Sequence, residues 1–412
     1  MGATANVSEL DQSELDQAAR PRPGFQGPSR ASDVWRRAWP DLFGPVPPGL
    51  RWSVVVPVKD EVDALPQLVA ALDRQRDEGG SPFARGHAEA LLVLNNCRDA
   101  TPQIAAALAE TRPWLRWTHI TLTGSQAHVG RARQLAMDAA CARLARAVPD
   151  GLAAADDRLI LSTDADTEPE PDWLAATTRE TERADAVGGR AMLRPDERAA
   201  LAPGVRRLYL LDIGYRRALE ELCALYAPEA WDPFPRHHHQ FGASLAVTAA
   251  AYAHVGGLPA ERTSEDVALV DALRAAGARL RHSPAVRVRT SARAVGRAEG
   301  GLADAFAWWA GQAEAGREPL VEPAADAERR LAALGLWAAA HPGAPHPSCW
   351  RTTPPAAQGC AQPLSQAIAD LRVRIARLRP LSQPQRLARA AALAARSAPL
   401  PAPPQTVFSL VA

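Results

Sequence analysis

Two aspartates in the middle of the chain have a type and spacing suited to metal chemistry. Asp164 and Asp166 follow three large apolar residues at 159–161 and two hydroxyl residues at 162–163, a run typical of a short buried strand. Carboxylates at the carboxyl end of a strand lie where open α/β sheets bind ligands. Two such hard oxygen ligands suit Mg²⁺ or Mn²⁺ holding a substrate diphosphate. The alternative is an acidic turn that caps a helix beginning at Trp173.

Alternating strands and helices must position these aspartates. The β-branched run 52–58 predicts a central strand of a covered parallel sheet. Further strands are predicted over 90–94, 116–122 and 158–162, with helices over 65–72, 101–109 and 130–147 between them. This alternation predicts an α/β fold with a doubly wound, mixed and mostly parallel sheet flanked by helices.

The common nucleotide-binding loops are missing from this α/β pattern. The first strand runs into Pro57-Val58-Lys59-Asp60-Glu61, without the glycines that let a backbone approach a pyrophosphate. The chain also contains no phosphate-binding glycine-lysine loop. A dinucleotide-dependent dehydrogenase is therefore disfavoured.

The remaining segments give a domain prediction. Residues 1–48 are rich in Pro, Gly, Ser and acidic side chains and predict a flexible arm, of which 33–43 docks on the body. The catalytic domain is expected over 49–315. Residues 316–412 predict an accessory helical, Pro-rich region. The later predicted elements are a helix over 204–226, strands over 186–189, 241–247 and 280–288, and C-terminal helices over 324–340, 364–378 and 386–397.

Composition limits the partners and the compartment. The 47 Lys and Arg residues nearly balance 46 Asp and Glu residues, so the net charge of +1 gives no reason to expect nucleic acid or an anionic membrane as a partner. Five scattered cysteines, none in a Cys-x-x-Cys pair, do not indicate a disulfide framework or a zinc site. Without a signal peptide or a long apolar run, we expect a cytoplasmic protein with no transmembrane segment.

The order of motifs resembles that of the family-two glycosyltransferases, which have the GT-A fold. The resemblance covers roughly residues 51–309 and depends on several motifs in the same order. They are Val54 to Glu61, Leu94 to Thr101, Gly130 to Arg133, Asp164-Ala165-Asp166, Gly242 to Leu245, Gly256-Gly257-Leu258 and Ser264-Glu265-Asp266. This resemblance implies a metal-dependent transferase that uses a nucleotide-diphosphate-sugar donor and inverts the anomeric carbon. The acceptor, whether glycan, lipid or small molecule, is left open.

The resemblance also implies roles for individual residues. Asp166 would coordinate the divalent cation, with Asp164 as a second ligand or a ribose contact. Asp266 would be the catalytic base, with Glu265 as its neighbour or as an acceptor contact. The donor-binding residues would be Pro57, Val58, Asp60, Glu61, Asn96, Arg131, Arg133, Asp164, Gly242 and Ala243. Asn96 lies where this family often has an aspartate that contacts the nucleotide base of the donor.

Several residues allow a second interpretation. Glu61 could cap the helix that enters at Asp63, and Ser264 with its acidic neighbours is also an ordinary helix start. Arg131 and Arg133 lie two residues apart on a helix, so we expect them to point in different directions. His282 is a weak candidate for a third metal ligand. The run 237–239 of three histidines favours an acceptor loop over a metal site.

Two other functions are compatible with the same motifs. A nucleotidyltransferase would also combine an α/β sheet, acidic residues and a divalent cation, but it would attack phosphorus and release pyrophosphate. A catalytically silent protein that binds sugar nucleotides would leave the donor intact.

Overall fold

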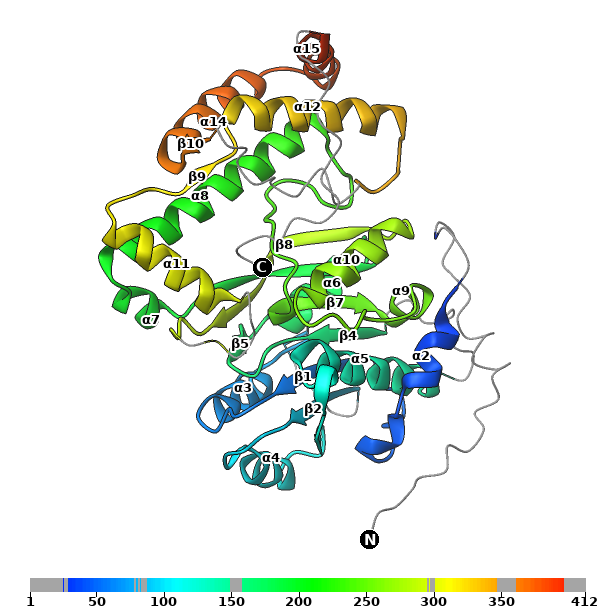
Figure 1. Ribbon diagram of the computed structural model, residues 1–412. Coiled ribbons are helices and arrows are strands. Elements are labelled where there is room, and N and C mark those ends of the chain that lie inside the picture. The colour runs from blue at the N-terminus through cyan, green and yellow to red at the C-terminus, as the bar shows by residue number, and fades with distance from the viewer. Residues whose placement is uncertain are drawn as a thin grey trace. The chain divides into compact units, whose positions relative to one another are not determined.

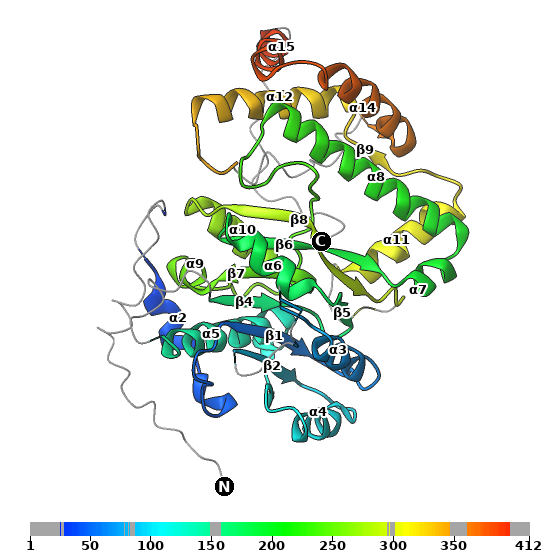
Figure 2. The ribbon, with the colours of Figure 1, turned by 180° about the vertical axis from the view of Figure 1, so that it is seen from behind.

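The computed structural model describes residues 25, 29–77, 79–80, 82, 87–148, 158–294, 296, 301–346 and 361–395 (Figures 1 and 2). Most of the predicted N-terminal arm and part of the Pro-rich C-terminal links lie outside the described residues. The chain divides into two compact units. Unit 1 comprises Met1–Ala165 and Ala246–Ala276, and unit 2 comprises Asp166–Leu245 and Gly277–Ala412.

The sheet of unit 1 is built around its first strand. Val54 of that strand aligns with Ala90 on one side and with Leu161 on the other, and both pairings are parallel. A strand with parallel neighbours on both edges and helices on its faces has little access to solvent, which explains its apolar sequence. The strands are β1 (Trp52–Val58), β2 (Ala88–Asn95), β3 (Leu115–Ile120), β4 (Leu159–Ser162) and β7 (Leu245–Thr248), in the order β3-β2-β1-β4-β7.

The long helix α5 (Val129–Arg146) organises the packing of unit 1. It is buried along most of its length and packs against β1, β2 and β4 (Figure 1). The other helical elements are α2 (Ala31–Arg37), η1 (Pro40–Phe43), α3 (Ala64–Asp73), α4 (Thr101–Glu110), η2 (Gly124–Gln126), α9 (Ala249–His254) and α10 (Glu265–Ala275). The predicted strand–helix alternation is confirmed in this unit.

The segment before the first strand is anchored by a buried ion pair. Arg143 of α5 contacts both carboxylate oxygens of Glu89 on β2, at 2.8 and 2.6 Å, and both side chains are fully buried. The same guanidinium donates to the carbonyl oxygens of Pro40 and Gly44, at 2.9 and 2.7 Å. Burying an arginine requires that its donors be satisfied, and the incoming chain supplies these acceptors. The predicted docking of residues 33–43 is confirmed.

The main strands of unit 2 are β6 (Ala186–Leu193), β8 (Leu280–Thr290) and β5 (Thr167–Pro169), which follow the order β6-β8-β5. Strand β6 pairs in parallel with β8, with a bulge between Gly189 and Arg190, and β5 pairs with β8 in the antiparallel direction. The remaining elements are α6 (Trp173–Thr181), α7 (Pro195–Ala200), α8 (Pro203–Tyr226), η4 (Gly242–Ser244), α11 (Leu302–Glu314), β9 (Leu320–Val321), α12 (Ala324–Ala340), β10 (Gln362–Pro363), α14 (Leu364–Leu378) and α15 (Gln383–Ala395).

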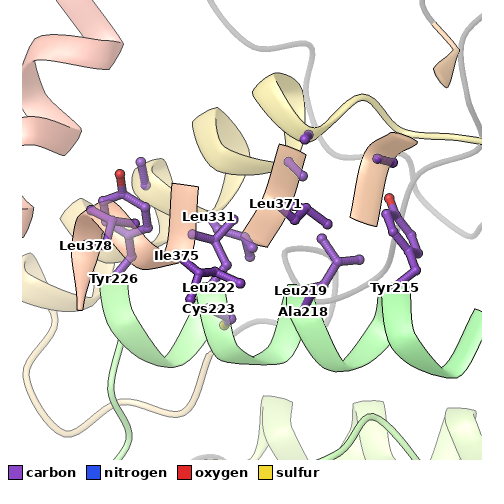
Figure 3. Packing of buried hydrophobic residues seen from close by; sticks show 14 of the residues in the cluster. Tyr215, Ala218, Leu219, Leu222, Cys223, Tyr226, Leu331, Leu371, Ile375 and Leu378 are labelled. Carbon is purple, nitrogen blue, oxygen red and sulfur yellow. The ribbon is translucent and has the colours of Figure 1, made fainter. Parts of the chain in front are cut away.

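The C-terminal helices share a hydrophobic core with α8 (Figure 3). Leu222 and Tyr226 of α8 pack with Leu331 of α12 and with Leu371 and Ile375 of α14. Each of these three helices has an apolar stripe, and burial of these stripes against one another holds α8, α12 and α14 together. The helices predicted beyond residue 316 therefore pack on a helix that lies before that boundary.

The predicted fold class is confirmed: the protein is α/β, with a mostly parallel sheet flanked by helices and a C-terminal helical region. One predicted strand is wrong in part. Residues 241–247 were expected to be a strand throughout, but Gly242–Ser244 form the 3₁₀ turn η4, and β7 begins only at Leu245. The turn is specified by packing, since a side chain at Gly189 would overlap the Ser244 hydroxyl.

Candidate functional site

The candidate site in unit 1 lies where the winding of the sheet reverses. The chain adds β2 and then β3 on one side of β1, and returns to add β4 on the other side. The connections that follow β1 and β4 therefore leave in opposite directions. Open α/β sheets bind ligands at the carboxyl ends of two such strands. Asp60 and Glu61 follow β1, and Asp164 follows β4.

The loops after β1 and β2 are tied to each other. Asp60 has a positive φ of 53°, and its Oδ1 accepts a hydrogen bond from the Arg98 backbone at 2.7 Å. The backbone N–H of Glu61 donates to the Thr101 hydroxyl at 2.8 Å. Glu61 is 6% exposed, and helix α3 starts without a side-chain cap. The backbone of Glu61 is thus held between the neighbouring loop and α3, because its carbonyl oxygen also accepts from the Leu65 backbone N–H at 3.0 Å.

Asn96 uses its amide to hold the chain after β3. Its Nδ2 donates to the carbonyl oxygen of Leu122, and its Oδ1 accepts from the Leu122 backbone N–H, both at 2.9 Å. The backbone of Asn96 has φ of 54°, a conformation that asparagine adopts more readily than most residues. Contact between Asn96 and a donor base stays a prediction.

Arg133 of α5 is the centre of the site. Its side chain is almost fully buried and donates hydrogen bonds in three directions: Nε to Glu265 Oε1 at 2.9 Å, Nη1 to Ser162 Oγ at 2.6 Å and Nη2 to Asp164 Oδ1 at 2.7 Å. Burial lowers the pKa of Arg133, but the charges of Asp164 and Glu265 outweigh burial, so the pKa is raised overall. The guanidinium is therefore a permanent charge that holds two carboxylates in place.

The arginine brings together acidic residues that are a hundred positions apart in sequence. The side chain of Asp164 is 35% exposed, so it reaches the surface although Arg133 holds its Oδ1. Glu265 is buried at the first turn of α10, and Asp266 next to it is half-buried. The first turn of α10 therefore carries Glu265, whose carboxylate is held by Arg133, and Asp266, whose carboxylate is more accessible.

The start of α10 differs from an ordinary serine-capped terminus. Ser264 adopts a left-handed backbone with φ of 59°, and its side chain makes no capping hydrogen bond. Such a conformation is strained for a residue other than glycine and turns the chain sharply just before Glu265. The predicted helix does start directly after Ser264, with both acidic residues in its first turn, but the serine side chain does not cap it.

The two arginines near the start of α5 diverge, as their spacing predicts. Arg131 donates to Gln134 Oε1 of the same helix, whereas Arg133 points to Asp164 and Glu265. Direct contact of either arginine with a donor phosphate stays a prediction.

Asp166 belongs to unit 2 and has basic partners there. Its Oδ2 lies 2.9 Å from Nη2 of Arg293, and its backbone carbonyl accepts from Arg194 at 3.0 Å. Arg194 also contacts Glu168 at 2.7 Å and Glu197 at 2.8 Å. The strand after the aspartate triplet is thus held in a charged network within unit 2.

The chemistry of this donor set fits a divalent cation. Asp164 and Asp166 offer carboxylate oxygens, and only Ala165 separates them in the chain. Within the residues that the structure describes, no group of three or more His, Cys, Asp or Glu side chains is placed to hold one metal ion. Mg²⁺ commonly binds one or two carboxylates and fills its remaining positions with water and substrate phosphates. Binding of a divalent cation by Asp164 and Asp166 stays a prediction.

The histidines lie in buried structural networks of unit 2. His282 Nδ1 is 2.8 Å from Asp232 Oδ2, with both side chains buried. His237 Nε2 contacts the Ser283 carbonyl oxygen at 3.0 Å, and His239 Nδ1 accepts from the Ala191 backbone at 3.1 Å. Each of these three rings thus has at least one nitrogen in a hydrogen bond within unit 2, and binding of a metal ion by His282 stays a prediction.

The buried His237 gives a testable acid dependence of stability. Burial, and then the charge of His282, lowers the pKa of His237 to about 3, whereas an unfolded chain binds the proton near 6.5. A lowered folded-state pKa stabilises the fold above about pH 6.5, and this stability is lost as the pH falls towards 3, by about 1.4 kcal/mol per pH unit. Between pH 7 and pH 4, the free energy of unfolding in urea should fall less steeply for His237→Gln than for wild type. The control is His119→Gln, which changes an exposed histidine. If the free energy of unfolding changed equally with pH in wild type and His237→Gln, the lowered pKa of His237 would be contradicted.

Gly242 and Ala243 are buried in η4 of unit 2. Ser244 at the end of this turn accepts a hydrogen bond from the Trp173 indole at 2.9 Å. The predicted contact of Gly242 and Ala243 with the donor stays a prediction, as does that of Pro57 and Val58, which are buried in β1.

Three polar residues of the site were missed in the sequence. Ser162 accepts from Arg133, Thr101 holds the Glu61 backbone, and Gln134 donates to the Leu258 carbonyl oxygen at 2.6 Å. Ser162 had a detectable signal, because it is a polar residue at the end of an otherwise apolar strand, directly before the aspartate triplet. Thr101 and Gln134 had none, since both read as ordinary helix residues.

No family model and no curated protein matches the chain. Solved structures of similar fold include the mannosyltransferase PcManGT from Pyrobaculum calidifontis in complex with GDP-Man and Mn²⁺, with 18% identity over 89% of this chain and 82% of that chain, and a TM-score of 0.38. S. aureus TarS 1-349 in complex with UDP-GlcNAc has 15% identity over 69% of this chain and 66% of that chain, with a TM-score of 0.37.

A third similar structure is glucosyl-3-phosphoglycerate synthase from Mycobacterium tuberculosis in complex with Mn²⁺, UDP and glucosyl-3-phosphoglycerate. It has 14% identity over 60% of this chain and 73% of that chain, with a TM-score of 0.34. Identities and scores of this size do not transfer a function from one protein to another.

None of the described helices combines the length and the hydrophobicity needed to cross a lipid bilayer.

Proposed function

We propose that the protein is a glycosyltransferase of GT-A type, which moves a sugar from a nucleotide-diphosphate-sugar donor to an acceptor hydroxyl with inversion. The observation that carries the proposal is the buried Arg133, which joins Asp164 after β4 to Glu265 at the start of α10. Buried ionic networks of this kind are costly to assemble, and a location at the switch point of an α/β sheet favours a functional reason for one.

The donor would lie along the carboxyl ends of β1, β2 and β4. Asp60, Glu61 and Asn96 are the candidates for the base and ribose, because they follow β1 and β2 and are fixed by the hydrogen bonds of their loops. Arg131 is the candidate for the diphosphate. In this proposal Arg133 acts through Asp164, since its guanidinium already donates to three protein acceptors.

Asp164 and Asp166 would hold a divalent cation, Mg²⁺ or Mn²⁺, together with the donor diphosphate. When bound, such a cation stabilises the negative charge that develops on the departing nucleoside diphosphate. The half-exposed side chain of Asp164 supports this role, because one of its oxygens is held by Arg133 while the side chain still reaches the surface.

Asp266 would act as the base. As the acceptor oxygen attacks the anomeric carbon, the bond from that carbon to the diphosphate oxygen breaks and the nucleoside diphosphate leaves with the bonding electrons. The acceptor proton passes to the Asp266 carboxylate. Glu265 is less suited to this step, because it is buried and held in a charge-assisted hydrogen bond by Arg133. Attack from the face opposite the leaving group inverts the anomeric configuration.

Asp166→Ala should abolish the metal-dependent part of donor binding, because the variant loses a cation ligand. Loss of one charge-assisted contact of about 1.5–3 kcal/mol corresponds to roughly 10- to 100-fold weaker binding. Thermal stabilisation by a panel of nucleotide sugars, measured with Mn²⁺ and with EDTA, tests this expectation. Asp196→Ala, which replaces an acidic residue in the first turn of α7, is the control. Equal Mn²⁺-dependent stabilisation of Asp166→Ala and wild type would contradict the metal assignment.

Analysis of the products separates the proposal from its rivals. A glycosyltransferase releases a nucleoside diphosphate and, without an acceptor, slowly hydrolyses the donor to free sugar. A nucleotidyltransferase releases pyrophosphate instead. An unchanged donor after long incubation, despite measurable binding, would indicate a catalytically silent sugar-nucleotide-binding protein.

A further inference from the structure

One face of α5 supports the chain segment that leads into Glu265 and Asp266. Gly130, Gln134 and Asp138 follow one another at intervals of four residues and so lie along the same face of the helix. The segment 256–264 runs from the end of α9 to the start of α10 and contacts this face at each of the three positions. All these elements belong to unit 1.

The first two contacts involve the backbone of the segment. A side chain at Gly130 would overlap the carbonyl oxygen of Glu261, so the absence of a side chain lets the segment approach the helix. Gln134 Nε2 donates to the Leu258 carbonyl oxygen at 2.6 Å. The segment is thus fixed to α5 on both sides of its midpoint.

The third contact includes a residue from the N-terminal helix α2. Arg37 Nε donates to Asp138 Oδ2 at 2.8 Å, and Arg37 Nη2 donates to the carbonyl oxygen of Gly256 at 2.8 Å. The Tyr252 hydroxyl donates to Asp138 Oδ1 at 2.7 Å. A single arginine therefore joins α2, α5 and the turn that follows α9.

The glycine turn is shaped by this ion pair. Gly257 has φ of 82°, and a side chain there would lie 2.7 Å from Asp138 Oδ1 and 2.8 Å from Arg37 Nη2. A second contact from the same N-terminal region is the hydrogen bond from the Arg30 backbone N–H to the His254 carbonyl oxygen, at 2.9 Å. The turn therefore has little freedom to move while α2 is in place.

We propose that Arg37, Gln134 and Asp138 are positioning residues for Asp266, so that α2, which precedes the first strand, forms part of the support of the catalytic base. The segment 256–264 is held at its start by the Arg37–Asp138 pair and in its middle by Gln134, and Glu265 just beyond it is held by Arg133. Asp266 follows directly. The part of this inference that concerns turnover depends on the proposed function, whereas the part that concerns the segment does not.

The test compares two neighbouring arginines of the same helix. Arg37→Ala removes the contacts to Asp138 and Gly256, while the control Arg36→Ala removes only an exposed contact to Asp33 within α2. In the ligand-free protein, we expect amide hydrogen exchange in 257–266 to become about tenfold faster in Arg37→Ala and to stay unchanged in Arg36→Ala. Exchange in β1 and β2 should stay unchanged in both variants.

The turnover measurement separates positioning from general stability. For hydrolysis of the sugar nucleotide, Arg37→Ala should lower kcat by about tenfold or more while the donor KM stays within about twofold. Gln134→Leu removes the Leu258 contact without touching α2 and should shift exchange and kcat in the same way, so it replaces Arg37→Ala if that variant does not fold. Its donor KM is not part of the comparison, because Gln134 Oε1 also accepts from Arg131.

Two results would overturn the inference. The first is unchanged exchange in 257–266, which decides the question even if wild type hydrolyses no nucleotide sugar. The second is faster exchange with an unchanged kcat, which would show that the segment does not position the base. A wild type without any turnover would refute the proposed function. Faster exchange in Arg37→Ala would then show only that Arg37 holds the segment in place.

Discussion

Arg133→Met should give a folded but inactive protein with a much lower free energy of unfolding. Removing the guanidinium leaves Asp164 and Glu265 facing each other without their shared counter-ion, and Glu265 and Ser162 are buried. Breaking a buried pair by removing one partner typically costs about 3–5 kcal/mol. Methionine keeps much of the volume, so the loss reports on charge and hydrogen bonds more than on packing. Chemical denaturation with and without a nucleotide sugar measures both effects.

Arg131→Met is the matched control for the loss of stability. Arg131 lies two residues away on the same helix, is half-buried and contacts Gln134, so its loss should cost at most about 1 kcal/mol. The double variant Arg133→Met with Glu265→Gln should recover part of the stability without recovering activity, because it removes one of the two unpaired charges. Wild-type stability in Arg133→Met would contradict the central role of this arginine.

Asp266→Asn should leave the donor bound and stop the transfer. Asparagine has the same shape and can still accept the hydrogen bond that Asp266 Oδ1 receives from the Val267 backbone at 2.8 Å, but it cannot take a proton from the acceptor. Loss of a general base typically costs about 10²- to 10⁴-fold in rate. We therefore expect kcat to fall by that factor, with donor affinity within about twofold and the free energy of unfolding within about 0.5 kcal/mol.

Glu265→Gln distinguishes the two adjacent carboxylates. Glu265 is an ion-pair partner of Arg133, so its change should lower stability as well as activity, whereas Asp266→Asn should lower activity alone. Initial rates together with urea unfolding separate the two patterns. Equal turnover of Asp266→Asn and wild type would remove the base assignment, and a large loss of stability in that variant would give Asp266 a structural role instead.

Much of the secondary structure could be predicted because local patterns specify it. The predicted helices 324–340 and 364–378 agree with α12 and α14 in both bounds, since each has an apolar stripe of helical period between clear ends. The run 52–58 likewise predicted β1 as a central strand. The turn at 242–244 was missed because its shape depends on the close approach of Gly189 and Ser244 from distant parts of the sequence.

The sequence by itself determined the α/β class, the order of strands and helices, and the location of Asp164 beyond the end of β4. These properties follow from hydrophobic periodicity, which acts over a few residues at a time. Only the tertiary structure decided that Arg133 turns inward to hold Asp164 and Glu265 while Arg131 does not, and that Arg37 of the N-terminal helix reaches Asp138. Burying an arginine is favourable only where several acceptors converge, and that convergence of segments distant in sequence is created by packing.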